Sequence, residues 1–383
     1  INGGRNGWSS KAFSIAVTRT ANFSNQIRYR GQNDFSSTGE QYAAEAAGSG
    51  LSLSDILNSN NVSLGTRMAT YAYLIDTVTI GNNAFPDLVA SSMYDQLKNG
   101  GDFLLNQSQF IETSGGITEA AVGFAGNRGD KFYLGGSVGI PIVNYRKETS
   151  YREEDATGAT DNYFNFSELN ETFTTTGAGI NLKLGAIFRP ADNLRFGLAV
   201  HTPTWYSLED TYEASLAVDV ENLRTTPGAV YVNSGTFTGG ETPRYKYELI
   251  TPWKMMLSGT YILNEVEDIR QQKGFITADV EYTTYKTNKF KNADDYDDGG
   301  YYDDLTDVMK SYYKNALNFR VGGELKFTTL MTRLGFAFYG SPYADDELKA
   351  NRMFITGGLG YRHGGIYIDL AYMHNVSKDV NFP

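Results

Sequence analysis

The stretch IFRPADNLRFGLAVHTPTWYSLED, residues 187–210, contains a turn followed by a long alternating segment. The turn, RPADN, is a cluster of residues that favour turns. After it, every second residue from Leu194 to Tyr206 falls on one face that is largely apolar, whereas the opposite face carries Arg195 and His201. A period of two residues over this length predicts a β-strand with two chemically different faces.

The composition of the whole chain also favours β-structure. Its 383 residues include 41 Gly, 27 Tyr and 22 Phe, but only 9 Pro and no Cys. Aromatic residues are enriched in strands, and no apolar run approaches the ~18 residues of a transmembrane helix. The absence of Cys excludes disulfides and thiolate metal sites. The net charge of −11 argues against nonspecific binding of nucleic acid, so no nucleic-acid partner is expected.

Alternation along the chain predicts eleven strands whose connections alternate in length. Short connections occur at 127–130, 190–193, 328–331 and 363–365, and long ones at 31–102, 150–171, 213–242 and 289–314. Outer-membrane barrels have this asymmetry, with short periplasmic turns and long external loops. The predicted strands lie near 10–30, 103–126, 131–149, 172–189, 194–212, 243–263, 274–288, 315–327, 332–340, 350–362 and 365–376.

Strand length and face pattern point the same way. Several predicted strands exceed the mean of ~5–6 residues in globular proteins, and a tilted bilayer crossing takes about 9–11. Each has a continuous apolar face opposite one that mixes Gly, polar and charged residues. We therefore expect an all-β fold, a transmembrane antiparallel up-and-down β-barrel, with a soluble all-β protein as the alternative.

Three stretches carry a resemblance to a known family. They are TRTANFSNQIRYRG (18–31), GGITEAAVGFAGNRGDKFYLGGSVGIPIVNY (115–145) and GAGINLKLGAIFRPADNLRFGLAVHTPTWYSLEDTY (177–212). The sequence resembles the FadL-like outer-membrane transporters for long-chain fatty acids and other hydrophobic compounds, in a branch often labelled haemin receptors. The resemblance implies a 14-stranded barrel in the outer membrane of a Gram-negative bacterium. It also implies a lumen plugged by an N-terminal hatch, and substrates that exit sideways into the membrane.

The chain departs from this family at both ends. The family's hatch, near its Asn-Pro-Ala signature, and its first two strands have no counterpart here, and a last strand after Val376 is missing. Two strands, the eleven predicted here and one more restore fourteen. We expect residues 1–383 to form a single, monomeric barrel domain, with a large helical external loop at 31–102.

The 31–102 loop is the first candidate site. Short helices are predicted near 39–47, 54–59 and 88–97, and the apolar residues between them are too many for a solvated loop. One interpretation is an external groove that collects hydrophobic ligands, and the other is a cap that buries its own apolar faces. The groove residues would be Leu51, Leu53, Ile56, Leu57, Tyr71, Tyr73, Phe85 and Leu88.

Breaks within predicted strands form a second candidate site. Gly115 and Gly116 interrupt one strand, and Pro141 and Pro203 each remove a ladder hydrogen bond from another. By the resemblance, such breaks imply a lateral gap through which substrate enters the bilayer. The alternative is a set of bulges that adjust barrel curvature.

The polar faces predict a network of charges inside the barrel. Unpaired charges are costly in a narrow interior, so we expect these side chains to pair with one another and with the hatch. His201 belongs to this set. The haemin-receptor label suggests haem ligation for it, but the chain has only three His, at 201, 363 and 374. The predicted network is Lys183, Arg195, His201, Asp279, Glu281, Arg320, Glu324, Lys326 and Arg333.

No enzyme, metal or cofactor site is expected. The sequence has no Gly-x-Ser-x-Gly elbow, no Ser/His/Asp arrangement that stands out and no P-loop. The acidic loop at 294–304 has carboxylates that suit Ca²⁺, but its spacing matches no EF-hand loop, and a solvated loop is the expected structure. The sequence therefore predicts passive outer-membrane uptake of small hydrophobic molecules, with such a molecule and membrane lipids as partners. The alternatives are haem uptake, or a non-transporting barrel that serves as a partner in an envelope protein assembly.

Overall fold

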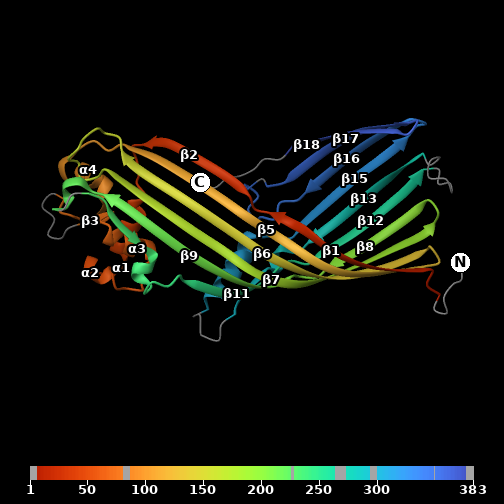
Figure 1. Ribbon diagram of the computed structural model, residues 1–383, viewed down its shortest axis with the longest axis horizontal. Helices are drawn as coiled ribbons and strands as arrows, with labels where there is room; N and C mark the ends of the chain where they lie inside the picture. Colours follow the sequence, from red (N-terminus) through yellow and green to blue (C-terminus); the bar gives the residue numbers. More distant parts are fainter. Residues whose placement is uncertain are drawn as a thin grey trace.

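A computed structural model describes residues 7–80, 87–225, 228–263, 273–293, 300–348 and 350–376. Within these ranges one antiparallel sheet dominates, and its main path is β1-β5-β6-β7-β8-β12-β13-β15-β16-β17-β18 (Figure 1). The strands of the path are β1 (Ser10–Asn22), β5 (Leu105–Arg128), β6 (Phe132–Asp155), β7 (Phe166–Ala191), β8 (Leu194–His201), β12 (Lys254–Leu263), β13 (Gly274–Thr283), β15 (Ala316–Lys326), β16 (Leu330–Tyr339), β17 (Arg352–His363) and β18 (Ile366–Asn375).

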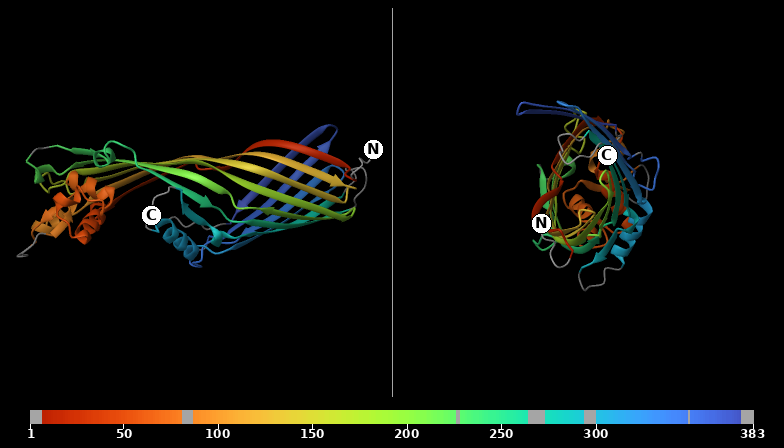
Figure 2. Two further views of the ribbon diagram at one scale, coloured as in Figure 1. Left: turned by 90° about the horizontal axis from the view of Figure 1, so that it is seen from below. Right: turned by 90° about the vertical axis from the view of Figure 1, so that its right-hand side faces the viewer.

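This path confirms the predicted up-and-down sheet of eleven strands. The short turns gather at the end of the sheet where the chain's N-terminus lies, and the long connections lie toward the other end (Figure 1). The sheet curls strongly, so that a view from the N-terminal end looks along its inside (Figure 2, right). The curl does not close: β1 and β18 are the two edges of the path, and the described residues show no pairing between them.

Three strands are much longer than the others. β5 and β6 have 24 residues each and β7 has 26, whereas β8 to β18 along the path have 8 to 12. The sequence prediction ended β6 at 149 and began β7 at 172, because alternation of apolar and polar residues fades there. The backbone ladder nevertheless continues, from Thr149 paired with Glu171 out to Glu154 paired with Phe166.

The long strands form a projecting part of the sheet, here called the stalk. Its flanks are β2 (Asn25–Asn33) on β5 and β9 (Trp205–Asp219) on β7. It is extended by three shorter strands and one short helix. The strands are β10 (Val230–Asn233), β11 (Arg244–Ile250) and β14 (Lys289–Asn292), and the helix is η3 (Ser234–Phe237). Helix α5 (Tyr301–Tyr312) packs against β14, and the short helices η2 (Glu221–Leu223) and η5 (Tyr285–Thr287) lie in connections.

An oblique line of strand interruptions, here called the break line, separates the stalk from the rest of the sheet. The predicted strand 194–212 is two strands, because Thr202–Thr204, three residues with Pro203 at the centre, oppose only two residues of β7. A second Thr-Pro pair, Thr251 and Pro252, interrupts the neighbouring strand between β11 and β12. The two interruptions are bonded to each other, since the Thr204 amide donates to Thr251 Oγ1 at 2.8 Å and the Thr251 amide donates to the Thr204 carbonyl at 3.1 Å.

The tip of the stalk carries a compact unit formed by residues 37–80 and 87–103, here called the head (Figure 1). It contains α1 (Gly39–Ser49), α2 (Leu53–Ile56), α3 (Leu64–Tyr71), the hairpin β3 (Ile75–Val78) with β4 (Asp87–Ala90), η1 (Ser91–Met93) and α4 (Tyr94–Asn99). Its core includes Ile56, Met68 and Leu74 and continues into Leu216 and Val218 of β9. Among the described residues, no helix is both long and apolar enough to cross a membrane.

Two of the three helices predicted in this segment are present near their expected positions. The third, at 88–97, is instead strand β4 followed by η1 and α4. Helix α3 was not predicted. Its Ser63 N-cap accepts a hydrogen bond from the Thr66 amide, and Ser-x-x-Thr is a weaker start signal than the usual capping box.

Candidate functional site

Between the break line and the short turns, a region called here below the break line, the two faces of the sheet differ in chemistry as the sequence predicted. The outer row that joins Leu198, Leu257, Val280 and Phe319 across four strands is apolar, and Leu257 is 60 % exposed. The next row, on the inner face, joins Gly197, Ser258, Asp279 and Arg320. An apolar face exposed over many strands is unusual for a protein surface in water.

The inner face below the break line lines an open cavity of about 1120 Å³. Its wall on β1, β5, β6, β7 and β8 is built largely from Gly, Ala and Ser, so the backbone itself borders much of the space. The charged side chains of the predicted network enter it from β7, β8, β13 and β15. These are Lys183, His201, Asp279 and Arg320.

The first of three charge clusters on this face centres on Glu119, a residue that the sequence analysis missed. Glu119 is 8 % exposed, forms an ion pair with Lys183 and accepts a hydrogen bond from Asn181 Nδ2 at 3.0 Å. Asn181 also donates to Thr204 Oγ1 at 3.3 Å, which ties the cluster to the break line. The alternation of side chains along β5 could have identified Glu119, because it places Glu119 on the same inner face as Gly123. A charged side chain on that face needs a partner.

The other two clusters lie on the opposite wall. Arg320 is 3.7 Å from Asp279 and 3.5 Å from Glu281, which also accepts a hydrogen bond from Asn318 at 2.8 Å. Nearer the short turns, Arg333 bridges two carboxylates. They are Glu324 at 2.5 Å and Asp369 at 2.8 Å, and Lys326 is 3.5 Å from Glu324. Most of the predicted charges thus have partners within the wall itself.

His201 and Arg195 lie on the same inner face of β8. His201 is opposite Lys183 on one side and Lys254 on the other, and it is half-buried. No group of three or more metal-ligating side chains was found in the described part of the chain. The register partners of His201 on the two neighbouring strands are therefore both lysines.

The predicted interruption at Gly115 and Gly116 is wrong, because β5 continues through both residues, and β6 likewise continues through Pro141. Of the four predicted break residues only Pro203 separates two strands, although all four lie on or near the break line. Gly115 has φ +94°, and a Cβ there would lie 2.1 Å from the Asn144 carbonyl oxygen, so the backbone conformation and the close approach both require glycine. Gly116 approaches the Ala21 carbonyl in the same way. Pro141 lies where the β6–β7 register is interrupted. Pro203 lies between β8 and β9.

Above the break line, the inner face of the stalk carries a series of aromatic rings, here called the aromatic track. Tyr212 packs against the head core, and its register partner on β7 is Phe173. Phe173 lies 6.4 Å from Tyr145, and Tyr145 lies 5.4 Å edge-on from Phe23 at the break line. Tyr206 lies on the same face of β9, just beyond the break line. The track leads from the head to the break line.

Two titratable groups on the inner face of the stalk have pKa values shifted by burial. Burial raises the pKa of the Tyr145 hydroxyl above its ordinary value. Burial likewise raises the pKa of the Asp210 carboxyl on the same face, against the opposing effect of hydrogen bonds from Thr175 and Tyr247.

The predicted external groove residues lie in or against the head. Ile56 is fully buried, and Leu51, Leu53 and Leu88 pack partly buried against the head core. Leu57 is half-buried, whereas Tyr71 and Tyr73 are 43 % and 40 % exposed. Tyr71 meets Phe237 edge-on at 6.0 Å, and Arg224 lies over the Tyr73 ring at 4.9 Å. Phe85 lies outside the described residues.

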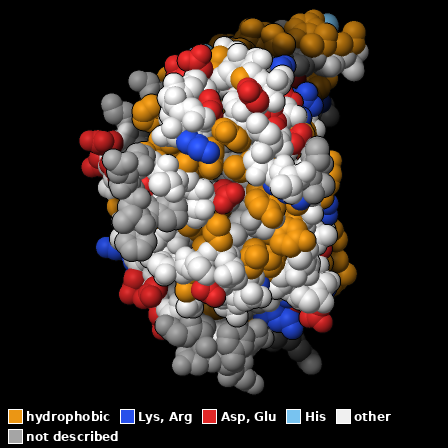
Figure 3. All heavy atoms as spheres, turned by 90° about the vertical axis from the view of Figure 1, so that its left-hand side faces the viewer, with side chains coloured by type: hydrophobic (Ala, Val, Ile, Leu, Met, Phe, Trp, Pro, Cys, Tyr) orange, Lys and Arg blue, Asp and Glu red, His pale blue; other side chains and the backbone are white. Residues whose placement is uncertain are grey.

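The head end of the molecule carries hydrophobic side chains in separate patches among acidic, basic and uncharged groups (Figure 3). Most of the apolar residues singled out in the loop are therefore used in packing the head, and the two tyrosines form its accessible aromatic surface. The acidic run at 294–298 lies outside the described residues. Asp303 and Asp304 lie in the first turn of α5, where a negative charge stabilises the helix dipole.

No protein-family model and no curated protein sequence matches the chain. Among solved structures, it is similar to a FadL homologue from Pseudomonas aeruginosa, with 16 % identity over 72 % of this chain and 67 % of that chain and a TM-score of 0.43. It is also similar to the monoaromatic hydrocarbon channel CymD, with 11 % identity over 73 % and 79 % and a TM-score of 0.38. A third structure, the toluene transporter TodX from Pseudomonas putida, has 12 % identity over 70 % and 72 % and a TM-score of 0.37. FadL is also the family that the sequence resembles.

Proposed function

We propose that this chain forms the wall of an outer-membrane barrel that lets small hydrophobic molecules cross passively. The part of the sheet below the break line has the length for a bilayer crossing, because its short strands have 8 to 12 residues and a tilted crossing takes about 9–11. Its exposed apolar outer face would meet lipid, and its polar inner face would line the lumen. The short turns would then face the periplasm.

The observation that carries the transport proposal is the aromatic track. It connects the head, which would be the outermost part of the protein, to the break line above the inner cavity. A hydrophobic molecule that leaves water gains free energy by contact with such a surface, and a series of separate rings offers contacts without one deep trap. Long-chain fatty acids and aromatic hydrocarbons both suit this chemistry. The descriptions of the solved neighbours, a hydrocarbon channel and a toluene transporter, name substrates of the same class.

In this proposal, a molecule would be taken up at the head, at the exposed rings of Tyr71 and Tyr73, and would follow the track inward. It would then reach the cavity or leave sideways at the break line, where Pro203 separates β8 from β9 and the β6–β7 pairing is interrupted at Pro141. The charge clusters of the inner wall would hold that wall in shape, because each links side chains from different strands. No energy source is required, since the molecule moves down its concentration gradient.

The test is uptake of radiolabelled oleate and of toluene by proteoliposomes that contain the full chain. We expect the double variant Y145S/F173S to lower uptake about tenfold relative to the unchanged protein. The matched control is R146S/T174S, which alters the neighbouring residues on the outer face of the same two strands. Equal uptake by the two double variants would overturn the role of the track.

The second candidate function is that of a membrane-embedded partner in an envelope assembly. The observation in its favour is the stalk: the 14 residues of β7 from Phe166 to Gly179 would hold the head about 45 Å beyond the break line. Proteoliposomes that contain the protein but take up no more oleate or toluene than empty ones would favour this reading. Cross-linking of the head to another envelope protein would then identify the partner.

A further inference from the structure

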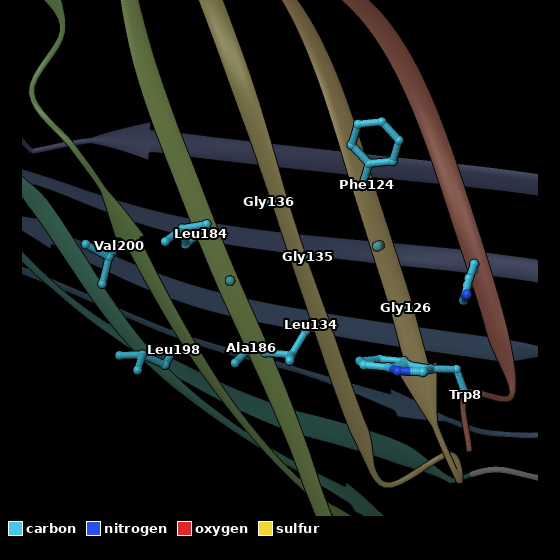
Figure 4. A pocket seen from close by; sticks show the side chains of 13 residues that line it. Trp8, Phe124, Gly126, Leu134, Gly135, Gly136, Leu184, Ala186, Leu198 and Val200 are labelled. Atoms are coloured by element: carbon cyan, nitrogen blue, oxygen red, sulfur yellow. The ribbon is translucent and has the colours of Figure 1, made fainter. Parts of the chain in front are cut away.

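The outer face of the sheet has a hollow of about 560 Å³ near the short turns (Figure 4). It lies over β5, β6, β7 and β8, where glycines replace large side chains in otherwise apolar rows. Gly136 stands in register between Phe124 and Leu184, and Gly126 stands beside Leu134. The walls of the hollow are the side chains of Phe124, Leu134, Leu184, Leu198 and Val200.

Trp8 closes the hollow on the side of the short turns. A Cβ at Gly126 would lie 2.8 Å from the indole ring, so the ring rests directly on the backbone of β5 and requires glycine there. Figure 4 shows Trp8 beside Gly126, with Phe124 farther along the same strand. Tryptophan is enriched where a membrane protein passes from hydrocarbon to the headgroup layer.

Two basic residues lie beside Trp8 on this outer face. Lys11 is the register partner of Gly126, and Arg128 is two residues beyond Gly126 on the same strand, so both share its face. The Arg128 side chain lies against Gly7, the residue before Trp8, since a Cβ at Gly7 would lie 3.7 Å from the Arg128 Nε. Both residues are exposed. The hollow thus has an apolar body and a basic end.

We propose that this hollow binds an anionic glycerophospholipid, with one acyl chain along the glycine floor and the phosphate at Lys11 and Arg128. The proposal rests on one part of the proposed function, that the outer face meets lipid, and not on transport. A void beside a protein wall loses dispersion contacts, and an acyl chain that fills this one restores them. Two cations at the headgroup level select an anionic headgroup over a zwitterionic one.

The experiment is native mass spectrometry of the full chain in detergent, with phosphatidylglycerol or phosphatidylethanolamine added at equal concentration. The variant G136L fills the floor, and its Cβ would meet only the Leu184 Cδ2 atom at 2.9 Å and the Lys183 carbonyl at 3.4 Å. The control G259L adds the same side chain to the same outer face, where the nearest atoms belong to Phe196 at 3.9 Å. We expect the unchanged protein and G259L to retain one phosphatidylglycerol, and G136L to retain it at least tenfold less.

The headgroup part of the proposal has its own variants. K11Q and R128Q should each lower the preference for phosphatidylglycerol over phosphatidylethanolamine about fivefold, whereas K291Q on the stalk should leave it unchanged. Equal retention of both lipids by the unchanged protein would overturn the headgroup assignment. Retention by G136L equal to that of G259L, or a second copy of the chain bound in place of lipid, would overturn the hollow as a lipid site.

The outcome is separable from that of the uptake test. G136L should lose the lipid and still take up oleate and toluene like G259L. If neither the unchanged protein nor any variant takes up these compounds while the lipid is retained, transport fails and the lipid site stands. If uptake is normal and no lipid is retained, the lipid site fails and the transport proposal stands.

Discussion

Glu153 places a fully buried carboxylate where the stalk meets the head. It accepts hydrogen bonds from Ser37 Oγ at 2.7 Å, from the Thr38 amide at 2.9 Å, and from Gln107 Nε2 and the Tyr151 hydroxyl, each at 2.9 Å. Thr38 directly precedes α1, so the carboxylate also faces the positive end of that helix. A buried charge without a cation is stable here because neutral donors surround it.

Replacing Glu153 with Ala should loosen the head from the stalk. It leaves at least two buried donors without an acceptor, which costs about 3 kcal/mol. Hydrogen exchange of the α1 amides should therefore become faster by about two orders of magnitude. The control is Glu154→Ala on the opposite face, where the half-exposed ion pair with Arg152 contributes under about 1 kcal/mol. Unchanged α1 exchange in the Glu153 variant would show that this carboxylate does not hold the head.

Glu45 makes the head sensitive to acid. It lies on α1 and accepts hydrogen bonds from the Ser63 amide and hydroxyl at 2.6 Å and from Thr66, at the start of α3. Burial alone would raise the pKa of Glu45, but these hydrogen bonds outweigh it and lower the pKa below 4.5. The stabilisation is therefore complete above about pH 4.5 and is lost as the pH falls through the lowered pKa.

We expect limited proteolysis of the head to accelerate as the pH is lowered from 5 to 3, with an acid-stable protease. The variant Glu45→Gln should be cleaved faster at pH 5 and should show a smaller change over that range. Glu40→Gln, on the same helix, serves as the control for charge removal. The same pH profile in all three proteins would contradict the assignment to Glu45.

At the scale of single residues, the sequence predicted on which face of the sheet a side chain lies better than it predicted which residue that side chain pairs with. The alternation of residues along their strands predicted that Lys183 and Arg320 share the polar face, and both line the inner face of the sheet. It did not identify Glu119 or Asp369, because the partner of a charge depends on strand register, and register is set by pairing between segments far apart in sequence. Ile56 shows a different limit of sequence reasoning. The sequence does not distinguish an apolar loop residue that binds a ligand from one that packs in a core.

At the scale of elements, the sequence identified residues of the break line, namely Gly115, Gly116, Pro141 and Pro203. It did not predict that they lie on one line across the sheet. The interruption at Thr251 and Pro252 aligns with that at Pro203 only after the strands are paired. The lengths of β6 and β7 were underestimated for a related reason. In the stalk these strands are mostly polar on both faces, with a few apolar side chains such as Tyr145 and Phe173 on the inner one, so hydrophobic alternation, the main strand signal, is weak there.

The break line should be intolerant of side chains at Gly115. In Gly115→Ala, the Cβ would clash with the Asn144 carbonyl and the residue would keep an unfavourable φ of +94°. We expect a loss of about 3 kcal/mol and a clear fall in the folded fraction, measured by the mobility of unheated samples in electrophoresis. Gly31→Ala, where no atom lies within 4 Å of the added Cβ, should fold like the unchanged protein. Normal folding of both would mean that the backbone at Gly115 relaxes freely.

At the scale of the whole molecule, the order of the strands and the sorting of short and long connections followed from the sequence. The stalk and the position of the head did not, because they depend on packing between the head and β9. Phe164, Leu216 and Val218 complete the head core from segments more than 100 residues beyond α1. The change from an apolar to a polar outer face across the break line is a further property of the assembled sheet.

That change of outer face gives a prediction for membrane insertion. Leu257 lies near the middle of β12 on the apolar outer face, and Ser215 lies on the outer face of the stalk. Leu257→Arg should destabilise the protein in lipid by about 2–4 kcal/mol, since an arginine at the bilayer midplane must lose much of its hydration. Ser215→Arg should cost under about 1 kcal/mol, because its side chain stays in water. Urea unfolding in liposomes measures both, and equal midpoints would place the lipid boundary somewhere other than the break line.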